Sequence, residues 1–307
     1  MSRHRRDQRS PRTQRARLTL SALLEAPRFE IMPTPDALDR VAELPAGSTV
    51  TVTASPRRGS EATVELVEQL AARGFAAVPH LAARRISDES ELNAILARLH
   101  AAGVRDLFVV GGDSPAPSGD FADGAALLKA IDAAGFGFER IGVPSYPEGH
   151  PHVDDDALWD ALLVKQGYAT YTVTQMCLDA TVVGQFISAA RRRGVTLPVI
   201  AGVPGPVPPA TLLRMGLRIG VGDSLKFARG HRKLARAFLR PSGYRPDALP
   251  LALAAIPSPG PIAPGPAGLH IYTFNETAAA AQWVDHLRRT VVQSAPQSAP
   301  HRREGRT

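Results

Sequence analysis

The stretch TVTVTASPRRGSEATVELVEQLAARGFAAVPH, residues 49–80, decides the fold. It opens with a β-branched run, Thr49–Thr53, and after a turn it shows a helical pattern over Glu61–Arg73. A second apolar run, Ala76–His80, follows at once. In the middle segment the apolar residues recur at helical spacing and leave the glutamates on the other face. This order of strand, helix and strand is the signature of a parallel βα unit.

The same pattern occurs eight times along the chain. The runs that we expect as strands are Arg28–Met32, Thr49–Thr53, Ala76–His80, Leu107–Val110, Arg140–Pro144, Thr170–Gln175, Pro198–Gly202 and Leu269–Thr273. Eight consecutive βα units close naturally into a barrel, whereas open doubly wound sheets usually have fewer strands. We therefore predict an α/β protein with a (β/α)8 TIM barrel, in a single domain over residues 25–290.

Helix-end signals agree with this prediction. Ser87 and the acidic residues after it predict the start of a helix over Glu91–Ala102, and Gly103 stands where a left-handed residue ends a helix. The seventh unit is longer than the others and predicts extra helices after the seventh strand. Their expected positions are Pro209–Arg218, Ser224–Leu239 and Asp247–Ile256.

The net charge of +7 is concentrated at the N-terminus. Residues 1–17 contain seven arginines and one aspartate, so the rest of the chain is nearly neutral. We interpret residues 1–24 as a basic, disordered arm, with a salt-sensitive contact to polyanions as the alternative. Residues 291–307 have the composition of a disordered tail. Without a basic face on the barrel, nucleic acid is not an expected partner.

The composition is that of a globular protein, with 44% hydrophobic and 21% charged residues. Its apolar runs are far shorter than a membrane span requires, so no membrane partner is expected. Cys177 is the only cysteine, which excludes an intramolecular disulfide and favours a cytoplasmic location. The sequence leaves a homo-oligomer open.

Polar residues gather where the expected strands end. Glu30 lies inside an otherwise apolar run, and burying an unpaired carboxylate is costly. One explanation is a general acid kept protonated by its apolar surroundings; the other is a salt bridge to a neighbouring lysine or arginine. Since the active site of a TIM barrel lies at the carboxyl ends of its strands, we take this end as the candidate site.

The other strand ends carry further candidates. These are Thr53, His80, Gly112, Asp113, Tyr146, His150, Gln175 and Tyr272, with Lys165 in an expected helix. Each has an ordinary structural alternative: a buried histidine, an aspartate in a turn or at a helix N-cap, an amide bonded to backbone, a core tyrosine or a solvated lysine. With Gly202-Val203-Pro204 at the seventh strand, all eight strand ends carry polar or turn-forming residues, which favours function.

Metal and nucleophile chemistry are not expected. His150 and His152 lack the further ligands and spacing of a zinc site, so we predict no metal. Ser114 and Ser145 have the wrong neighbours for a nucleophile elbow. A hydrolase with a covalent intermediate is therefore not indicated.

From Arg28 to Leu287 the chain resembles methylenetetrahydrofolate reductases. The matching motifs are, in order, Phe29-Glu30, Pro79-His80-Leu81, Gly112-Asp113, Tyr146-Pro147-Glu148-Gly149-His150-Pro151, Thr174-Gln175 and His270-Ile271-Tyr272-Thr273-Phe274-Asn275. The Tyr-Pro-Glu-Gly-His-Pro and His-x-Tyr-Thr-x-Asn strings are the specific ones, and the others contribute through order and spacing.

The resemblance implies a (β/α)8 fold and reduction of 5,10-methylenetetrahydrofolate to 5-methyltetrahydrofolate, as in methionine biosynthesis. NADH or NADPH supplies the hydride, classically by way of FAD. By position, Glu30 is the general acid, Asp113 and Gln175 bind the pterin, and Tyr272 belongs to the substrate site. The positions that hold the flavin in FAD-containing members are Thr53, His80, Gly112, Asp113, Tyr146, His150 and Lys165.

The chain also departs from the family pattern. Gly111 stands where FAD-dependent members have arginine, the loop Thr53–Gly59 lacks the usual aromatic residue, and Glu276 replaces a common arginine. These departures favour direct hydride transfer from the nicotinamide to folate over transfer through FAD. Arg57 and Arg58 are then candidates for contact with the dinucleotide phosphates or the glutamate tail of folate.

Two other functions stay open at this point. One is a different folate enzyme, such as a methylfolate demethylase or a subunit that works with a partner. The other is a catalytically silent barrel that serves as a binding module, against which the presence of Glu30, Asp113 and Gln175 argues.

Overall fold

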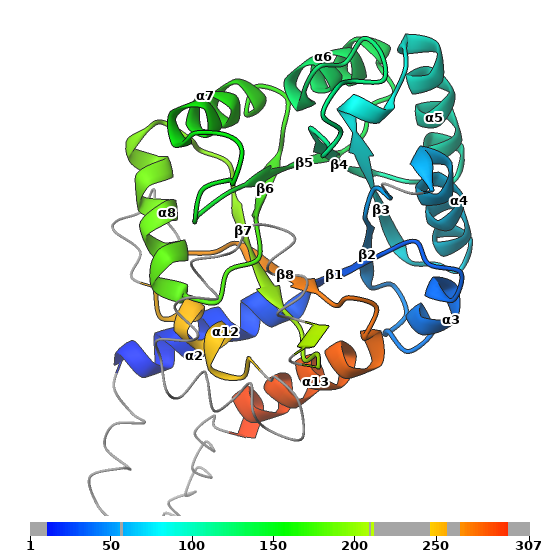
Figure 1. Cartoon of the computed structure of the whole chain (residues 1–307). Coiled ribbons are helices and arrows are strands. Elements are labelled where there is room, and N and C mark those ends of the chain that lie inside the picture. The colour runs from blue at the N-terminus through cyan, green and yellow to red at the C-terminus, as the bar shows by residue number, and fades with distance from the viewer. Residues whose placement is uncertain (1–10, 56–57, 209, 212–245, 257–264, 294–307) are drawn as a thin grey trace, which may run out of the picture.

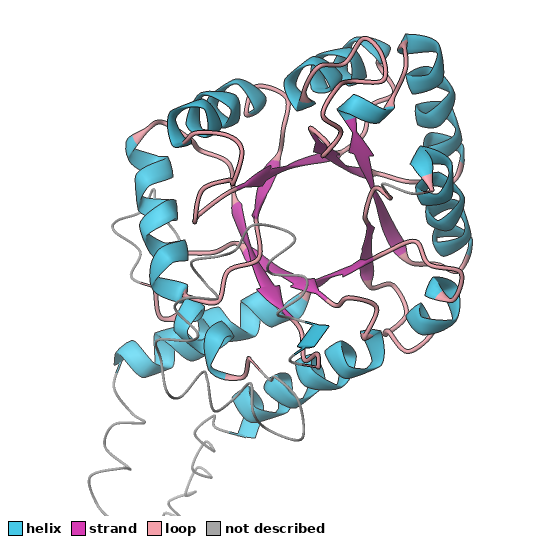
Figure 2. Ribbon diagram, in the orientation of Figure 1, coloured by secondary structure: helices cyan, strands magenta, loops and turns pink. Residues whose placement is uncertain are grey.

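The computed structural model describes residues 11–55, 58–208, 210–211, 246–256 and 265–293. Eight parallel strands close into a barrel in the order in which they occur in the chain, and helices surround it (Figures 1 and 2). The predicted (β/α)8 TIM barrel is therefore confirmed.

All eight expected strands are present, with ends within two residues of the predicted ones. They are β1 (Arg28–Ile31), β2 (Thr49–Val52), β3 (Ala76–Ala82), β4 (Asp106–Val110), β5 (Arg140–Ser145), β6 (Tyr171–Thr174), β7 (Val199–Pro204) and β8 (Gly268–Tyr272). The described helices are α2 (Pro11–Glu25), α3 (Ala37–Val41), α4 (Gly59–Ala72), α5 (Glu89–Ala101), α6 (Gly124–Ala134), α7 (Asp155–Lys165), α8 (Ala180–Arg192), α12 (Ala248–Ala254) and α13 (Thr277–Gln293), with a 3-10 turn at Ala83–Arg85.

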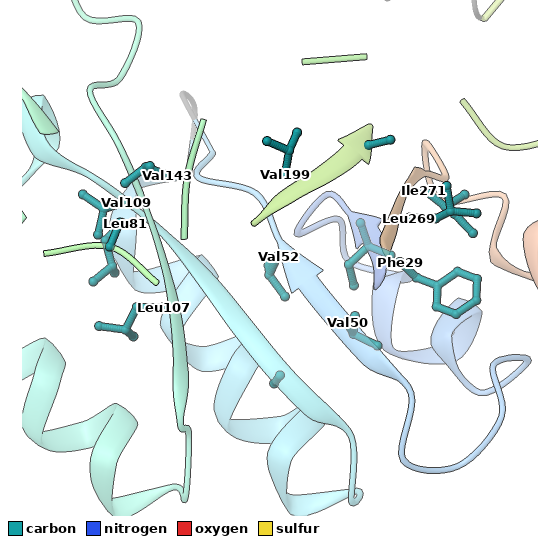
Figure 3. Packing of buried hydrophobic residues seen from close by; sticks show 14 of the residues in the cluster. Phe29, Val50, Val52, Leu81, Leu107, Val109, Val143, Val199, Leu269 and Ile271 are labelled. Carbon is teal, nitrogen blue, oxygen red and sulfur yellow. The ribbon is translucent and has the colours of Figure 1, made fainter. Parts of the chain in front are cut away.

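The core has two parts because strand side chains alternate between the two faces of the barrel wall. One set packs with the helices, and Figure 3 shows members of it on their strands, among them Val50, Val52, Leu107, Val109 and Ile271. The other set fills the barrel and consists of Val78, Phe108, Tyr171, Val173 and Ile200, with Val110 against it.

A buried ionic network lies at the amino ends of the strands. Arg28 donates from Nη1 to Asp106 Oδ2 at 3.0 Å, and the Tyr171 hydroxyl donates to Asp106 Oδ1 at 2.8 Å. The guanidinium carbons of Arg28 and Arg140 stand 4.6 and 4.9 Å from the centroid of the Tyr171 ring. Burial raises the pKa of Asp106, and the charge of Arg28 opposes that rise. The network joins four strands at the end of the barrel that usually serves stability.

The N-terminal arm differs from the prediction. Pro11–Glu25 is helix α2, which packs on α12, α13 and β8, so the expectation of disorder is wrong for residues 11–24. Leu20, Leu23 and Leu24 are buried at helical spacing, and Arg288 donates to the Leu24 carbonyl at the helix end. The prediction of disorder rested on the arginines that precede these leucines and overlooked the short apolar stripe that the leucines form. Residues 1–10 lie outside the described part.

Two other boundaries moved. Helix α13 continues to Gln293, so 291–293 of the expected tail are helical, while 294–307 are outside the described residues. Helix α5 is capped by Asp88, whose carboxylate accepts the Glu91 N–H, and not by Ser87. Gly103 has the expected left-handed conformation, with φ of 79°.

Of the extra helices expected after the seventh strand, only the third can be compared in full. It is present as α12. Residues 210–211 are helical, but the rest of the first segment and all of the second fall within 209 and 212–245, outside the described residues. Among the helices of the described residues, none combines the length and apolar character needed to cross a membrane.

Candidate active site

Glu30 lies between two histidines inside the barrel mouth. Its Oε2 is 3.1 Å from Nε2 of His270 on β8 and 3.7 Å from Nε2 of His80 on β3. The Glu30 side chain is 16% exposed and that of His270 1%. Both of these neighbours are imidazoles, and neither is the lysine or arginine that the structural alternative required.

The contact with His80 is not an ion pair at neutral pH. Burial lowers the pKa of His80 to about 4, although the charge of Glu30 works in the opposite direction. The imidazole is therefore neutral at pH 7 and lies 4.6 Å from the Phe108 ring. Within the described part of the chain, Nε2 of His80 and Nδ1 of His270 are buried without a hydrogen-bond partner.

Tyr272 crosses the mouth from β8 to β6. Its hydroxyl donates to the Thr174 carbonyl at 3.0 Å, passing over β7 at Gly202. A Cβ at Gly202 would stand 2.2 Å from that carbonyl oxygen and 2.8 Å from the Tyr272 ring, so this position requires glycine. Burial, then the charge of Glu30, raise the pKa of Tyr272, which keeps the phenol protonated.

Asp113 faces the loop that follows β5. Burial first, and then the charge of Asp113, raise the pKa of Tyr146 to about 12. Burial lowers the pKa of His150, while Asp113 raises it. The Tyr146 and His150 rings stand nearly perpendicular, with centroids 5.1 Å apart. A second group therefore consists of Asp113, Tyr146 and His150. It is close to the first group, since Tyr146 also contributes to the raised pKa of Tyr272.

Asp113 is not a helix cap. Helix α6 is capped by Asp123, whose carboxylate accepts the N–H groups of Ala125 and Ala126. Asp113 follows Gly112, which has φ of 92°, and its side chain is exposed. The helix-cap alternative is thereby removed, and Asp113 lies in a bend of the chain.

Gln175 follows β6 and is held by its own backbone. Its N–H donates to the Ser145 carbonyl at 2.7 Å, and its Oε1 accepts the N–H of Met176 at 2.8 Å. In this conformation one lone pair of Oε1 is engaged, and the Nε2 donors point the side chain toward an acceptor on a ligand.

The remaining expected cofactor residues are dispersed. Thr53 N–H donates to the Ile31 carbonyl at 3.0 Å at the end of β2. Lys165 reaches the start of α6, where a Cβ on Gly124 would stand 3.6 Å from its Nζ. Burial lowers the pKa of Lys165, and the charge of Asp123 raises it. Arg58 donates to the Pro33 carbonyl at 3.0 Å, and Arg57 lies outside the described residues.

A cavity of about 470 Å³ lies between the loop after β5 and helices α7 and α8. Tyr146 and Lys165 line it, together with Trp159 and Phe186, whereas Glu30 does not. We place the reacting centre at the barrel mouth because the titratable cluster is there. Among the described residues, no group of three or more His, Cys, Asp or Glu side chains is arranged to hold a metal ion.

His270 is the residue that sequence reasoning missed as a functional group. It appeared only as the first letter of the His-x-Tyr-Thr-x-Asn motif. A histidine within the apolar β8 run was the available signal, since an imidazole is unusual inside a buried parallel strand. Its partner lies 240 residues away in the sequence, so the pairing needs barrel closure.

Together, these features define a TIM-barrel protein with a carboxyl and two imidazole groups at the carboxyl ends of its strands. The family model described as methylenetetrahydrofolate reductase matches residues 11–213. The chain belongs to this family. The match includes Glu30, Asp113 and Gln175, while His270 and Tyr272 lie beyond it.

A solved structure with a similar chain path is described as a "putative phosphonomutase" from Burkholderia cenocepacia J2315. It is 13% identical, covers 92% of this chain and 98% of its own, and has a TM-score of 0.44. Similarity at this level carries no argument about function.

Proposed function

We propose that this protein reduces 5,10-methylenetetrahydrofolate to 5-methyltetrahydrofolate with NADH or NADPH as hydride donor. Membership of the family supports an oxidoreductase that acts on folate-bound one-carbon units. The observation that carries the proposal is the shielded carboxyl of Glu30, 3.1 Å from His270 at the barrel mouth. Cytoplasmic location and homo-oligomerisation stay predictions.

The chemistry needs a proton before it needs a hydride. Glu30 donates a proton to a ring nitrogen of the folate as its bond to the methylene carbon breaks, which leaves a cationic iminium. The nicotinamide hydride then adds to that carbon and gives the methyl group and oxidised dinucleotide. A proton taken from solvent, to which the Glu30 side chain is 16% exposed, restores the acid.

Asp113 contributes electrostatically to the same step. A carboxylate near the iminium stabilises its positive charge as it forms. Asp113 is exposed at the mouth and acts on Tyr146, so it lies on the side from which ligands enter. Gln175, through its Nε2 donor, is proposed to bind a pterin acceptor, and Tyr272 to form the floor beneath it.

The described residues do not fit the diphosphate of a resident flavin. The N–H groups of Ala125 and Ala126 at the start of α6 are occupied by the Asp123 carboxylate, which places a negative charge near Lys165. Arg58 and Arg84 donate to backbone carbonyls. A dinucleotide that leaves after each turnover needs less retention. We therefore propose that the nicotinamide passes its hydride directly to the folate.

Two measurements on the purified full-length protein test the proposal. NADH or NADPH oxidation should depend on added methylenetetrahydrofolate, with 5-methyltetrahydrofolate as the product. A visible spectrum should lack flavin bands while the protein is active. Bound flavin that is required for turnover would refute direct transfer, and a different product would favour another folate enzyme.

Replacing the proposed acid gives the sharper test. Glu30→Gln keeps the shape but cannot donate an acidic proton, so kcat should fall by roughly 10²–10⁴ while folate still binds. Glu43→Gln, at an exposed position, is the matched control and should keep wild-type kinetics. Glu30→Gln turning over at the wild-type rate would remove Glu30 from the mechanism.

A further inference from the structure

The loop between β4 and α6 is held in place by one arginine. This loop, residues 111–123, carries Gly112 and Asp113 and passes over the 3-10 turn Ala83–Arg85 that follows β3. Arg84 in that turn makes four hydrogen bonds to the loop, two from its side chain and two from its backbone. Their partners are distributed along nearly the whole loop.

The side chain holds both ends of the exposed part of the loop. Nη1 of Arg84 donates to the Ser114 carbonyl at 2.9 Å, directly after Asp113. Nε donates to the Ala122 carbonyl at 2.9 Å, directly before the cap residue Asp123. A guanidinium is planar and offers donors in a fixed fork, so one rigid group sets the distance between the two carbonyls.

The backbone adds contacts between these ends. Arg84 N–H donates to the Gly111 carbonyl, and the Arg84 carbonyl accepts the Ser118 N–H, both at 3.0 Å. A Cβ on Gly119 would stand 1.7 Å from the Ser87 carbonyl oxygen, so the two segments touch backbone to backbone. This second attachment joins the loop to the segment that follows the 3-10 turn.

We infer that Arg84 is a positioning residue: it fixes the β4–α6 loop and thereby holds the Asp113 carboxylate at the barrel mouth. The effect on catalysis rests on the proposed function, whereas the effect on the loop does not. Asp113 is exposed, so in the described part of the chain it is the loop, not packing around the carboxylate, that determines where the charge lies. Electrostatic stabilisation depends on such preorganisation.

Kinetics of Arg84→Ala test the catalytic consequence. Misplacing a charged group by about 1 Å can cost on the order of 10²-fold, so we expect kcat/KM to fall by roughly 10- to 100-fold. In an Asp113→Asn background the same change should cost less than about 3-fold, because the charge that Arg84 positions is already gone. Arg105→Ala, at an exposed arginine that precedes β4, is the control and should keep the wild-type rate.

Hydrogen exchange of the loop tests the positioning itself. Amide exchange over 111–123 should be faster in Arg84→Ala than in the wild type and in Arg105→Ala, with the thermal transition of each variant recorded. If Arg84→Ala is unstable, Arg84→Lys should fold normally. Its loop amides should still exchange faster than in the wild type, since an ammonium lacks the two fixed donors of a guanidinium.

The outcomes separate this inference from the proposed function. Unchanged exchange in Arg84→Ala, or equal losses of activity with and without Asp113, would overturn the inference. Faster exchange in a protein whose wild type shows no folate-dependent oxidation would support the positioning role and refute the proposed function instead.

Discussion

At the scale of single residues, the candidate site combines groups that are costly to bury. Glu30 was predicted as a candidate because a carboxylate interrupts an apolar run, and the structure places it beside two imidazoles. His270 could not be assigned from the sequence, because its significance lies in a partner on the neighbouring strand β1. Because His80 is neutral, the imidazole on the β3 side of Glu30 carries no positive charge.

The neutral state of His80 predicts a pH dependence of stability. Its pKa is about 4 when folded and 6.5 in the reference state, so the unfolded chain binds more protons between these values and stability falls as the pH falls through this window. From pH 7 to 5.5 the contribution of His80 amounts to about 1 kcal/mol. Urea denaturation at pH 7 and 5.5 measures the free energy of unfolding. Its loss between these pH values should be smaller by that amount in His80→Gln than in the wild type.

The exposed His286 on α13 provides the control for this prediction. His286→Gln should retain the pH dependence of the wild type. The same slope in the wild type and in His80→Gln would show that His80 is not the buried neutral histidine inferred here.

At the scale of elements, the rim of the barrel explains why Asp113 was ambiguous. Helices α6, α7 and α8 begin with aspartate caps, namely Asp123, Asp154 and Asp179, and α5 with Asp88. From the sequence alone, Asp113 fits the same role. The structure shows that helix α6 begins eleven residues after Asp113, at Gly124, so Asp113 does not cap it.

Helix α2 shows how local composition can mislead. An arginine-rich segment suggests disorder, yet the apolar stripe that ends it is buried against α12 and α13. Leu24→Ala removes a side chain that is 1% exposed and should lower the free energy of unfolding by about 2–5 kcal/mol. Leu18→Ala, at 67% exposure on the same helix, should change it by less than about 0.5 kcal/mol. Equal effects in urea denaturation would contradict the docking of α2.

At the scale of the whole molecule, barrel closure joins the first and last strands and so creates both polar centres. Closure pairs Glu30 with Tyr272 in register across β1 and β8 and brings His270 to the acid. The same closure lets Arg28 reach Asp106 and Tyr171 at the opposite end. The barrel thus has a structural ionic network at the amino ends of its strands and the candidate site at their carboxyl ends.

Breaking the ionic network at the amino ends of the strands should have a large effect on stability. Arg28→Met leaves the Asp106 carboxylate buried without its closest cation and should cost about 3–5 kcal/mol in the free energy of unfolding. Replacing both partners, Arg28→Met with Asp106→Leu, should recover a large part of that loss. Arg105→Met breaks the exposed contact with Glu139 and should cost less than about 1 kcal/mol. Urea denaturation followed by tryptophan fluorescence measures all three.

The sequence by itself determined the barrel and the set of candidate residues. Strand and helix periodicities are local, so eight βα units can be counted along the chain, and Glu30 and Asp113 stand out by chemical type within their own segments. The tertiary structure decided the partners: His270 for Glu30, Arg84 for the Asp113 loop, and α12 and α13 for the apolar side of α2. Such pairings depend on strand closure and on loop packing, which are non-local, and no local pattern specifies which distant groups will share a buried space.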